Sequence, residues 1–391
     1  MSDIYQQSLL AHKKWRGKLR IELNAPLSNK EELSLAYTPG VAQPCREIHR
    51  DPELVYDYTW VGNTVAVITD GTAVLGLGDI GPKASLPVME GKCALFKSFA
   101  GIDAIPIALD TKDPDEIIRI CKALASSFGG INLEDISAPR CVTIERELKK
   151  ALNIPVFHDD QHGTAIVVAA GLINALKLVN KRFDELKVVV SGAGAAGSSI
   201  MYMLRDLGIK NILGFRKEGI IRKENHDDFL VQELSEFVNP KQLNITLREA
   251  MVNADVFIGV SAPRLVDQAM IQSMNSHSIV FALANPEPEI TYLEAKEAGA
   301  YIIATGRSDY PNQVNNVLAF PGLFRGALDA KATKISEEMK MAAAVGLASL
   351  IQASELTPDY IIPSVFDSRV KDVVSQAVKD VAIELGYTRK S

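Results

Sequence analysis

The sequence lacks the features that mark several large classes of protein. Its 391 residues include only four cysteines (Cys45, Cys93, Cys121 and Cys141), and none has the CxxC spacing of a zinc or redox site. This pattern predicts reduced thiols in a cytoplasmic protein. The formal net charge is −6 and the pI is near 5.7. Because phosphate binding needs a basic face, nucleic acid is not expected as a main partner.

Long apolar runs are also missing. The best window, residues 164–179, contains Asn174 and Lys177, so no charge-free stretch reaches the length of a membrane span. The N-terminus has no signal-peptide pattern, and no internal repeat is visible. The composition, 47% hydrophobic and 23% charged, is that of a globular protein without a membrane partner. This chain length suggests two domains or a little more.

Short apolar runs alternate with helical segments along the whole chain. Strands are predicted at residues 65–70, 105–110, 130–133, 187–191, 211–215, 256–260, 279–284 and 301–304, with a helix over 114–125. Such alternation predicts parallel sheets with helices on their faces, an α/β fold. We expect an N-terminal α/β catalytic domain over residues 1–160 and a C-terminal Rossmann-type domain over 161–391. The helix-rich segment after Asn316 is expected to pack back on the first domain.

Two acidic pairs follow strand-like segments, Glu134-Asp135 and Asp159-Asp160. Parallel strands of one βαβ unit end at the same edge of a sheet, so the two pairs are expected to lie close together. Adjacent carboxylates stay ionised when a cation neutralises them, and Mg²⁺ or Mn²⁺ prefers such oxygen ligands. The pattern predicts a metal site, although either pair alone is also typical of a solvated turn.

A zinc-peptidase reading of the same segment is rejected. His158 and His162 have the i, i+4 spacing of the zinc-binding helix motif. That motif needs a continuous helix, whereas residues 153–157 look like a strand and Gly163 follows at once. We expect the helix to begin near Thr164.

The second half opens with a G-x-G-x-x-G segment between a strand and a helix. Gly192 is expected to make the turn, Gly194 to let the backbone approach a pyrophosphate, and Gly197 to allow close helix packing. The helix that begins at about Ala195-Ala196 would direct its positive end at the pyrophosphate. The context predicts a dinucleotide-binding site.

The second strand of this unit ends unusually. An NAD site usually has an acid there to hold the ribose hydroxyls, but this strand ends in Arg216-Lys217, with no acid until Glu218. Arg216 favours acceptance of the 2′-phosphate of NADP, yet an arginine can also stack on adenine. We therefore predict use of both NAD and NADP.

In five ordered motifs the chain resembles the malic enzyme family in its short bacterial form. The motifs are YTPGVA at 37–42, TDG at 69–71 with LGLGD at 75–79, PVMEGK at 87–92, NLED at 132–135 with FHDDQHGT at 157–164, and NNVLAFPG at 315–322. The resemblance implies a catalytic domain ahead of a Rossmann domain. It also implies a homodimer, with Tyr37 serving its own site or the partner's.

The resemblance assigns roles to individual residues. Tyr37 and Lys92 would be the proton-transfer pair, with Asp159 as a catalytic neighbour of Lys92 that raises the lysine pKa. The metal ligands would be Glu134, Asp135 and Asp160. Asn285 would contact substrate and cofactor, and Asn315 and Asn316 would contact substrate. The reaction implied is oxidative decarboxylation of (S)-malate to pyruvate and CO₂ with reduction of NAD(P)⁺. Base catalysis by Lys92 and acid catalysis by Tyr37 suit its two proton transfers.

One departure keeps two other functions open. Larger family members have an arginine that binds a substrate carboxylate where Ala73 stands here. A cofactor-independent oxaloacetate decarboxylase would need only the metal site, Lys92 and Tyr37. A non-enzymatic dinucleotide-binding protein is the third reading, because a fold does not guarantee activity.

Overall fold

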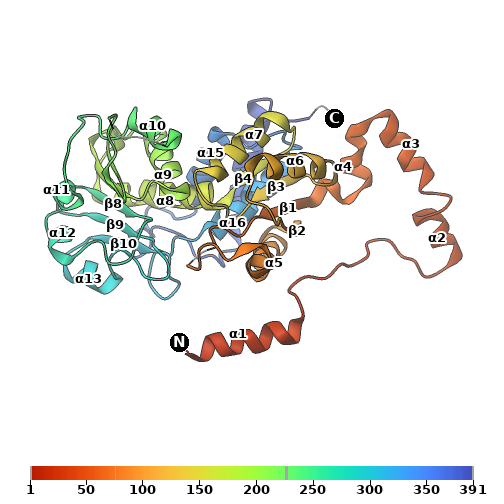
Figure 1. Ribbon diagram of the computed structural model, residues 1–391, viewed down its shortest axis with the longest axis horizontal. Coiled ribbons are helices and arrows are strands. Elements are labelled where there is room, and N and C mark those ends of the chain that lie inside the picture. Colours follow the sequence, from red (N-terminus) through yellow and green to blue (C-terminus); the bar gives the residue numbers. More distant parts are fainter. Residues whose placement is uncertain (1, 75, 225–227, 390–391) are drawn as a thin grey trace.

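The computed structural model describes residues 2–74, 76–224 and 228–389. Leu75, the first residue of the LGLGD motif, lies outside the described residues. Figure 1 shows two α/β units side by side, with an N-terminal arm projecting from the first unit. The predicted α/β fold is confirmed.

The first unit contains the arm and a four-stranded sheet. Its elements, with 3₁₀ helices written η, are α1 (Ser2–Trp15), α2 (Lys30–Ala36), α3 (Ala42–Arg50), η1 (Pro52–Leu54), α4 (Val55–Tyr58), η2 (Trp60–Asn63), β1 (Thr64–Thr69), α5 (Gly81–Ala100), β2 (Asp103–Ala108), α6 (Pro114–Leu124), η3 (Ala125–Ser127), β3 (Gly130–Leu133), α7 (Arg140–Ala151) and β4 (Val156–His158).

The strands of this sheet are parallel and follow the order β2-β1-β3-β4. All six residues of β1 are buried, because helices cover both faces of the sheet. The chain first steps from β1 to β2 and then crosses to β3 on the other side of β1. This change of direction places a topological switch point at the carboxyl ends of β1 and β3, where α/β sheets bind ligands.

The second unit contains a six-stranded sheet and the C-terminal helices. Its elements are α8 (Asp159–Val179), η4 (Phe183–Glu185), β5 (Lys187–Ser191), α9 (Ala195–Asp206), β6 (Asn211–Arg216), β7 (Gly219–Ile220), α10 (Phe229–Ser235), α11 (Leu247–Met251), β8 (Val256–Gly259), α12 (Gln268–Gln272), β9 (Ile279–Ala282), α13 (Tyr292–Glu297), β10 (Ile302–Thr305), η5 (Asn316–Leu318), α14 (Phe320–Asp329), α15 (Glu337–Ser349) and α16 (Arg369–Glu384).

The second sheet has the order β10-β9-β8-β5-β6-β7. All its strands are parallel except β7, which pairs antiparallel with β6 as a short hairpin. The order reverses at β5, with β6 on one side and β8 on the other. The carboxyl end of β5 is therefore a second switch point.

Helix α8 is the main helix of the shared core. It packs against α9 and α15, and most of its residues are buried. By length and composition it is the one helix in the described part of the chain that could cross a membrane, and 72% of its apolar window is buried inside the protein. A soluble core helix passes the same test. Helix α8 follows directly after β4, with no linker between the two units. The domain boundary near residue 160 stays a prediction.

The C-terminal helices return to the first unit, as Figure 1 shows for the blue part of the chain. Phe320 and Phe324 of α14 pack edge-on against Phe96 of α5, with ring centroids 4.7 and 5.3 Å apart. Phe324 also packs against Phe157 of β4. This aromatic cluster fixes α5 beside the carboxyl ends of the first sheet.

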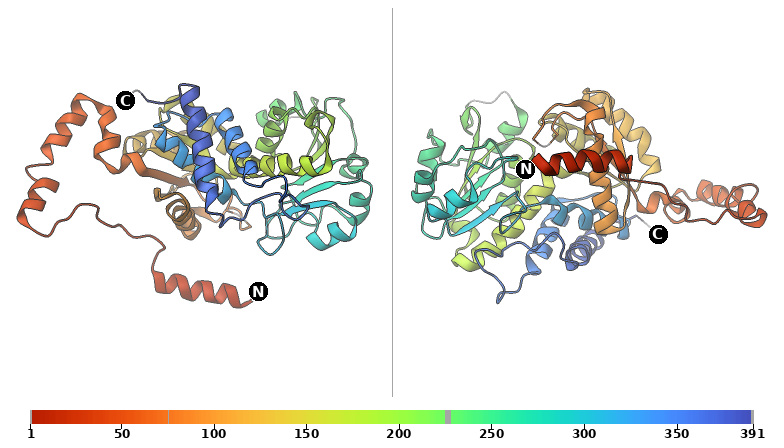
Figure 2. Two further views of the ribbon diagram at one scale, coloured as in Figure 1. Left: turned by 180° about the vertical axis from the view of Figure 1, so that it is seen from behind. Right: turned by 90° about the horizontal axis from the view of Figure 1, so that it is seen from below.

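The N-terminal arm, residues 2–60, contacts the body sparsely. Figures 1 and 2 show α2 and α3 standing away from both sheets. Beyond α1 the chain is fixed to α5 at Lys18, whose backbone N–H donates to Glu90 at 2.9 Å and whose Nζ donates to the Pro87 carbonyl at 2.6 Å. Large apolar side chains on the arm are exposed, including Ile4, Tyr5, Leu9, Leu10, Trp15, Ile21, Leu23, Leu33, Leu35 and Tyr37.

Candidate functional site

Three carboxylates gather at the switch point of the first sheet. Glu134 and Asp135 follow β3, and Asp160 lies in the first turn of α8, directly after β4. Their ligand oxygens all lie within 4.8 Å of one another, and Glu134 and Asp135 are buried. The predicted cluster is therefore brought together by parallel strands that end at one edge.

The geometry of the cluster leaves an oxygen without a protein partner. The Asp135 backbone N–H donates to Asp160 Oδ2 at 2.7 Å, and Asp135 has a left-handed backbone, φ 53°. The Oδ2 atom of Asp135 is buried and accepts no hydrogen bond within the described residues. A buried carboxylate oxygen without a donor is costly, and a cation would satisfy it.

Two carboxyl groups of the cluster have raised pKa values. Burial raises the pKa of Glu134 well above its usual value, although the nearby Lys92 acts to lower it. Burial, together with repulsion by Asp160, raises the pKa of Asp135 to about 8. The donor set of three carboxylates on rigid strand ends suits a hard divalent cation.

Lys92, on the buried face of α5, points into the same site. Its Nζ lies 2.5 Å from Asp159 Oδ2 and 2.8 Å from Glu134 Oε1, and 4.3 Å from the centroid of the Phe320 ring. Burial works against the lysine charge, but Asp159 and Glu134 outweigh it and hold the pKa of Lys92 above its usual value. Burial also raises the pKa of Asp159. The predicted pairing of Lys92 with Asp159 is thus present.

Asn316 reaches the same carboxylate from the other unit. Its amide Nδ2 donates to Asp159 Oδ2. The close approach requires a glycine at position 163, because a Cβ there would lie 2.1 Å from Asp159 Oδ1 and 2.7 Å from Asn316 Cβ. Asn315 caps the following 3₁₀ helix, with its Oδ1 accepting from the Val317 N–H at 3.0 Å.

The expected helix start near Thr164 is wrong. Helix α8 begins at Asp159, with His158 as its N-cap. Acidic residues in a first turn are favoured by the helix dipole, and Gly163 is accommodated inside the helix. The two histidines still do not converge on one point, because His158 Nδ1 accepts from the Gln161 N–H at 3.2 Å and His162 turns its Nε2 to a glutamate of α7.

The glycine loop of the second sheet has the predicted form. Gly192 has φ +112°, and a Cβ at Gly197 would lie 2.0 Å from the Gly192 carbonyl oxygen, so helix and turn pack as only glycine permits. Gly194 is exposed and faces open space. Ala195 and Ala196 form the first turn of α9. The free N–H groups of that turn face the position that a pyrophosphate takes in such folds.

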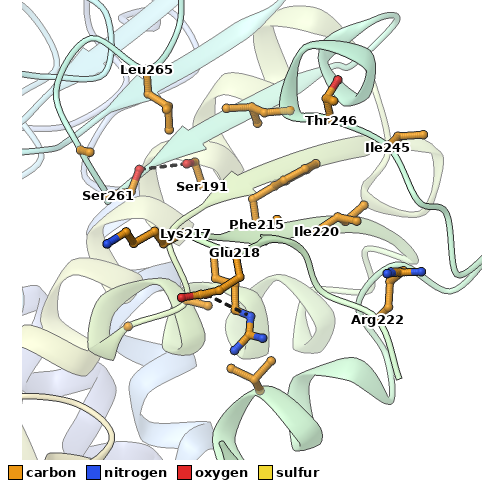
Figure 3. Close-up of a pocket in the computed structure, with 18 of the residues that line it drawn as sticks. Ser191, Phe215, Lys217, Glu218, Ile220, Arg222, Ile245, Thr246, Ser261 and Leu265 are labelled. Carbon is orange, nitrogen blue, oxygen red and sulfur yellow. Dashed lines mark hydrogen bonds and ion pairs between the residues drawn. The ribbon is translucent and has the colours of Figure 1, made fainter. Parts of the chain in front are cut away.

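A cavity of about 970 Å³ lies beside this loop, and Figure 3 shows its walls. The loop residues Gly192 and Gly194, the end of β6 and the β6–β7 turn line it. Arg216, at the end of β6, lines the cavity, with its Nε 3.3 Å from Glu218 Oε2. Its expected contact with the dinucleotide stays a prediction. A volume of this order suits a bound nucleotide.

Two other predicted positions lie near the sites without contacting their charged groups. Asn285 is exposed in the turn after β9, and the following Pro286 lies within 3.7 Å of a Cβ placed on Gly76. This turn therefore borders the loop after β1. Ala73 is exposed, and its N–H donates to the Asp135 carbonyl at 2.9 Å. The backbone at position 73 thus lies next to Asp135 of the carboxylate cluster.

Tyr37 is not brought to Lys92 within one chain. It caps the C-terminus of α2 and is 66% exposed. Figures 1 and 2 show α2 at the outer end of the arm, away from α5.

A buried polar network behind the carboxylate cluster was missed. His162 Nε2 donates to Glu145 at 2.9 Å, and its Nδ1 accepts from Ser199 and from Lys340, each at 3.1 Å. Burial lowers the pKa of His162 to about 4 and that of Lys340 to about 8. The sequence signal for this network is Lys340, a lysine within the apolar segment that forms α15. The network ties α7, α8, α9 and α15 together behind Asp160.

Comparison with known proteins agrees with both halves of this architecture. Residues 16–149 match the malic enzyme N-terminal domain, and residues 161–385 match the malic enzyme NAD binding domain. The chain is 54% identical over 389 residues to the bifunctional malic/malolactic enzyme of Bacillus subtilis, covering 99% of this chain and 95% of that one. It is 46% identical to the NADP-dependent malic enzyme of Halomonas elongata, covering 100% and 96%. The structure superposes on the NAD-dependent malic enzyme of Thermotoga maritima with a TM-score of 0.92, at 49% identity and coverage of 95% and 98%. The chain belongs to the malic enzyme family.

Proposed function

We propose that the protein catalyses oxidative decarboxylation of (S)-malate to pyruvate and CO₂, with reduction of NAD⁺ or NADP⁺. The observation that carries the proposal is the cluster of Lys92, Asp159, Glu134, Asp135 and the partly exposed Asp160 at one switch point. Helix α8 joins this cluster to the dinucleotide loop at the other switch point. Family membership supports the same reaction.

We propose Glu134, Asp135 and Asp160 as the ligands of a divalent cation, Mg²⁺ or Mn²⁺. Three carboxylates leave about three positions of an octahedral ion for substrate and water. When bound, such an ion lowers the pKa of a substrate hydroxyl and stabilises negative charge on the C2 oxygen during decarboxylation. Among the described residues no donor reaches Asp135 Oδ2, which supports this assignment over a purely structural carboxylate cluster.

In this proposal the chain's own residues transfer the protons. Lys92 first passes its proton to Asp159, 2.5 Å away, and its neutral amine then takes the proton of the C2 hydroxyl, so the two groups titrate as a unit. Asn316 holds Asp159 in place by donating to the same Oδ2 atom. Asn315 and Asn285 are proposed to orient the substrate, and Asn285 also to border the nicotinamide.

We further propose a homodimer in which Tyr37 serves the partner's site as the acid that protonates the enol product. Its support is the arm itself, which exposes large apolar side chains and holds α2, capped by Tyr37, away from α5, which carries Lys92. Apolar surface of this kind is normally covered in a symmetric assembly. Each site would then be incomplete without a second copy.

We propose a cytoplasmic setting with no nucleic-acid or membrane partner. The four cysteines are unpaired, three of them buried, and the chain carries a net charge of −6. Reduced thiols are typical of that compartment. Fractionation of the producing cell tests this proposal, and recovery of the protein in the membrane or secreted fraction would contradict it.

The direct test supplies purified protein with (S)-malate, Mn²⁺ and either dinucleotide, and follows reduced nicotinamide and pyruvate together. Equal formation of the two products is expected. The same sample is given oxaloacetate without dinucleotide, because the site could decarboxylate it alone. Decarboxylation of oxaloacetate far faster than any malate oxidation would replace the proposal with a cofactor-independent decarboxylase. Dinucleotide binding without turnover of either acid would leave a binding protein.

A further inference from the structure

The β6–β7 hairpin forms one wall of the 970 Å³ cavity beside the glycine loop. Strand β6 ends at Arg216, Lys217 and Glu218 make a two-residue turn, and Gly219 pairs back with Arg216 at φ +125°. In a Rossmann unit the end of the second strand faces the adenosine ribose of the dinucleotide. The tight turn brings Glu218, two positions beyond the strand end, to that same place.

Glu218 is paired with the arginine that the ribose site presents. Its Oε2 lies 3.3 Å from Arg216 Nε, and Figure 3 marks this ion pair of Glu218 with a dashed line. Both residues line the cavity. The Arg216 side chain is 24% exposed and that of Glu218 is 62% exposed. The arginine is thus held by the wall, whereas the carboxylate is open to a ligand.

We propose that Glu218 is the residue that sets the choice between NAD and NADP, and that it favours NAD. This inference rests on the dinucleotide use proposed above. The carboxylate supplies from the turn the acceptor for ribose hydroxyls that the strand end lacks. It also offsets the charge of Arg216. To contact Arg216, the 2′-phosphate of NADP must displace the Glu218 carboxylate. It then lies beside that carboxylate, and the repulsion between the two negative groups opposes binding.

The cavity offers a matched comparison. Arg222 lines another part of the wall, and Figure 3 shows it on a different segment from Glu218. Glu224 Oε2 lies 3.7 Å from Arg222 Nη1, and Glu224 itself does not line the cavity. Glu224→Gln therefore removes the same charge beside a cavity arginine without touching the ribose position. Any general change of the local field should appear in both variants.

The experiment compares wild type, Glu218→Gln and Glu224→Gln by kcat/KM for NAD⁺ and NADP⁺ with malate and Mn²⁺. The Kd of each dinucleotide is also measured without malate. Two ratios compare NADP⁺ with NAD⁺, that of their kcat/KM values and that of their Kd values. Glu218→Gln should shift both ratios in favour of NADP⁺ by about tenfold or more, the scale of one charge-assisted hydrogen bond. Glu224→Gln should leave them unchanged. Introducing Arg216→Ala into Glu218→Gln should reverse most of the gain with NADP⁺.

An unchanged ratio in Glu218→Gln, or an equal shift in Glu224→Gln, would overturn the proposal. The Kd measurement tests dinucleotide selection independently of whether the protein oxidises malate. If no variant turns over malate, the catalytic proposal fails, while the ratio of the two binding constants still shows whether Glu218 selects the dinucleotide.

Discussion

Asp159 Oδ2 lies 2.5 Å from Lys92 Nζ, although the two residues are 67 positions apart in the chain. The contact joins the first turn of α8 to the middle of α5, and so fixes the proton-transfer group relative to the carboxylate cluster. Glu134 contacts the same ammonium group at 2.8 Å. The lysine is therefore both a candidate base and the cation that balances the buried carboxylates.

Lys92→Met should reduce kcat for malate oxidation by about 10²–10⁴-fold, the usual contribution of general acid–base catalysis. The side chain keeps its length but cannot accept a proton. Dinucleotide Kd should not change, because the glycine loop lies on the other sheet. Lys97→Met is the control, since Lys97 is an exposed residue of the same helix paired with Asp103, and it should behave like wild type. Retention of more than about a tenth of the activity by Lys92→Met would contradict the assignment.

Asp160→Asn should raise the Mn²⁺ concentration needed for half-maximal activity and lower turnover, because it removes a charged ligand. Mn²⁺ titrations of activity and of thermal stability both measure this. Asp103→Asn removes a similar charge at the opposite, amino end of the first sheet and should have no effect on either titration. Identical Mn²⁺ dependence in Asp160→Asn and wild type would refute the metal assignment.

Stabilisation of the protein by Mn²⁺ should grow as pH rises. Burial and Asp160 raise the pKa of Asp135 from 3.8 to about 8. A raised carboxyl pKa means that its contribution to stability is full below about pH 4 and is lost as pH rises towards about 8. The cation binds the ionised form and removes that loss. The increase in Tm on adding Mn²⁺ to chelator-treated protein should rise across this window. The same increase at every pH would show that Asp135 is not a ligand.

The parallel strands and the gathering of the acidic pairs could be predicted from sequence, whereas the order of the strands within each sheet could not. Buried parallel strands are continuous apolar runs, and an acidic pair that directly follows such a run must lie at the sheet edge. The pairs Glu134-Asp135 and Asp159-Asp160 are therefore expected together without any contact information, and the family resemblance selects Asp160 of the second pair as the ligand. The strand at 187–191 and the helix start at Ala195 were also correct, because glycines bound both.

Contacts between distant segments could not be predicted in this way. No local pattern shows that Phe320 underlies Lys92, or that Lys340 meets His162 behind the cluster. The sequence places the start of α8 too late because Gly163 is typical of a helix end. The glycine is needed inside the helix because it packs closely against the Asp159 side chain. The position of Tyr37 at the end of an extended arm depends on long-range packing in the same way.

Mixing two inactive variants should restore activity if Tyr37 acts in the partner's site. Tyr37→Phe should impair protonation of the enol, and Lys92→Met should remove the base. In a mixed dimer in which each chain supplies its Tyr37 to the partner's site, one site carries both substitutions and the other carries neither. Random re-pairing should then recover about a quarter of wild-type activity.

The control for this mixing experiment is a pair of variants in one site, Lys92→Met with Asp160→Asn, which should not complement. Light scattering must show a dimer in each sample. Absence of recovery in a mixture shown to contain mixed dimers would place Tyr37 in the site of its own chain. A monomer mass near 42.5 kDa would remove the dimer proposal itself.

Gly163→Ala should inactivate the enzyme even though alanine is the better helix former by about 1 kcal/mol. The added Cβ would lie 2.1 Å from Asp159 Oδ1 and 2.7 Å from Asn316 Cβ, so both side chains must move away from the site. Gly171, in the same helix, is the control. A Cβ there would meet Ile362 and Phe281 at 3.0–3.3 Å, in the core and away from the catalytic groups.

Gly171→Ala should therefore cost stability with little change in kcat, whereas Gly163→Ala should lower kcat while the protein remains folded. Urea unfolding and steady-state kinetics on both variants separate these effects. The two substitutions are chemically identical, so any difference between their effects on kcat must come from the different surroundings of the two positions. If Gly163→Ala kept wild-type kcat, the position of Asp159 beside Lys92 could not be essential to the reaction.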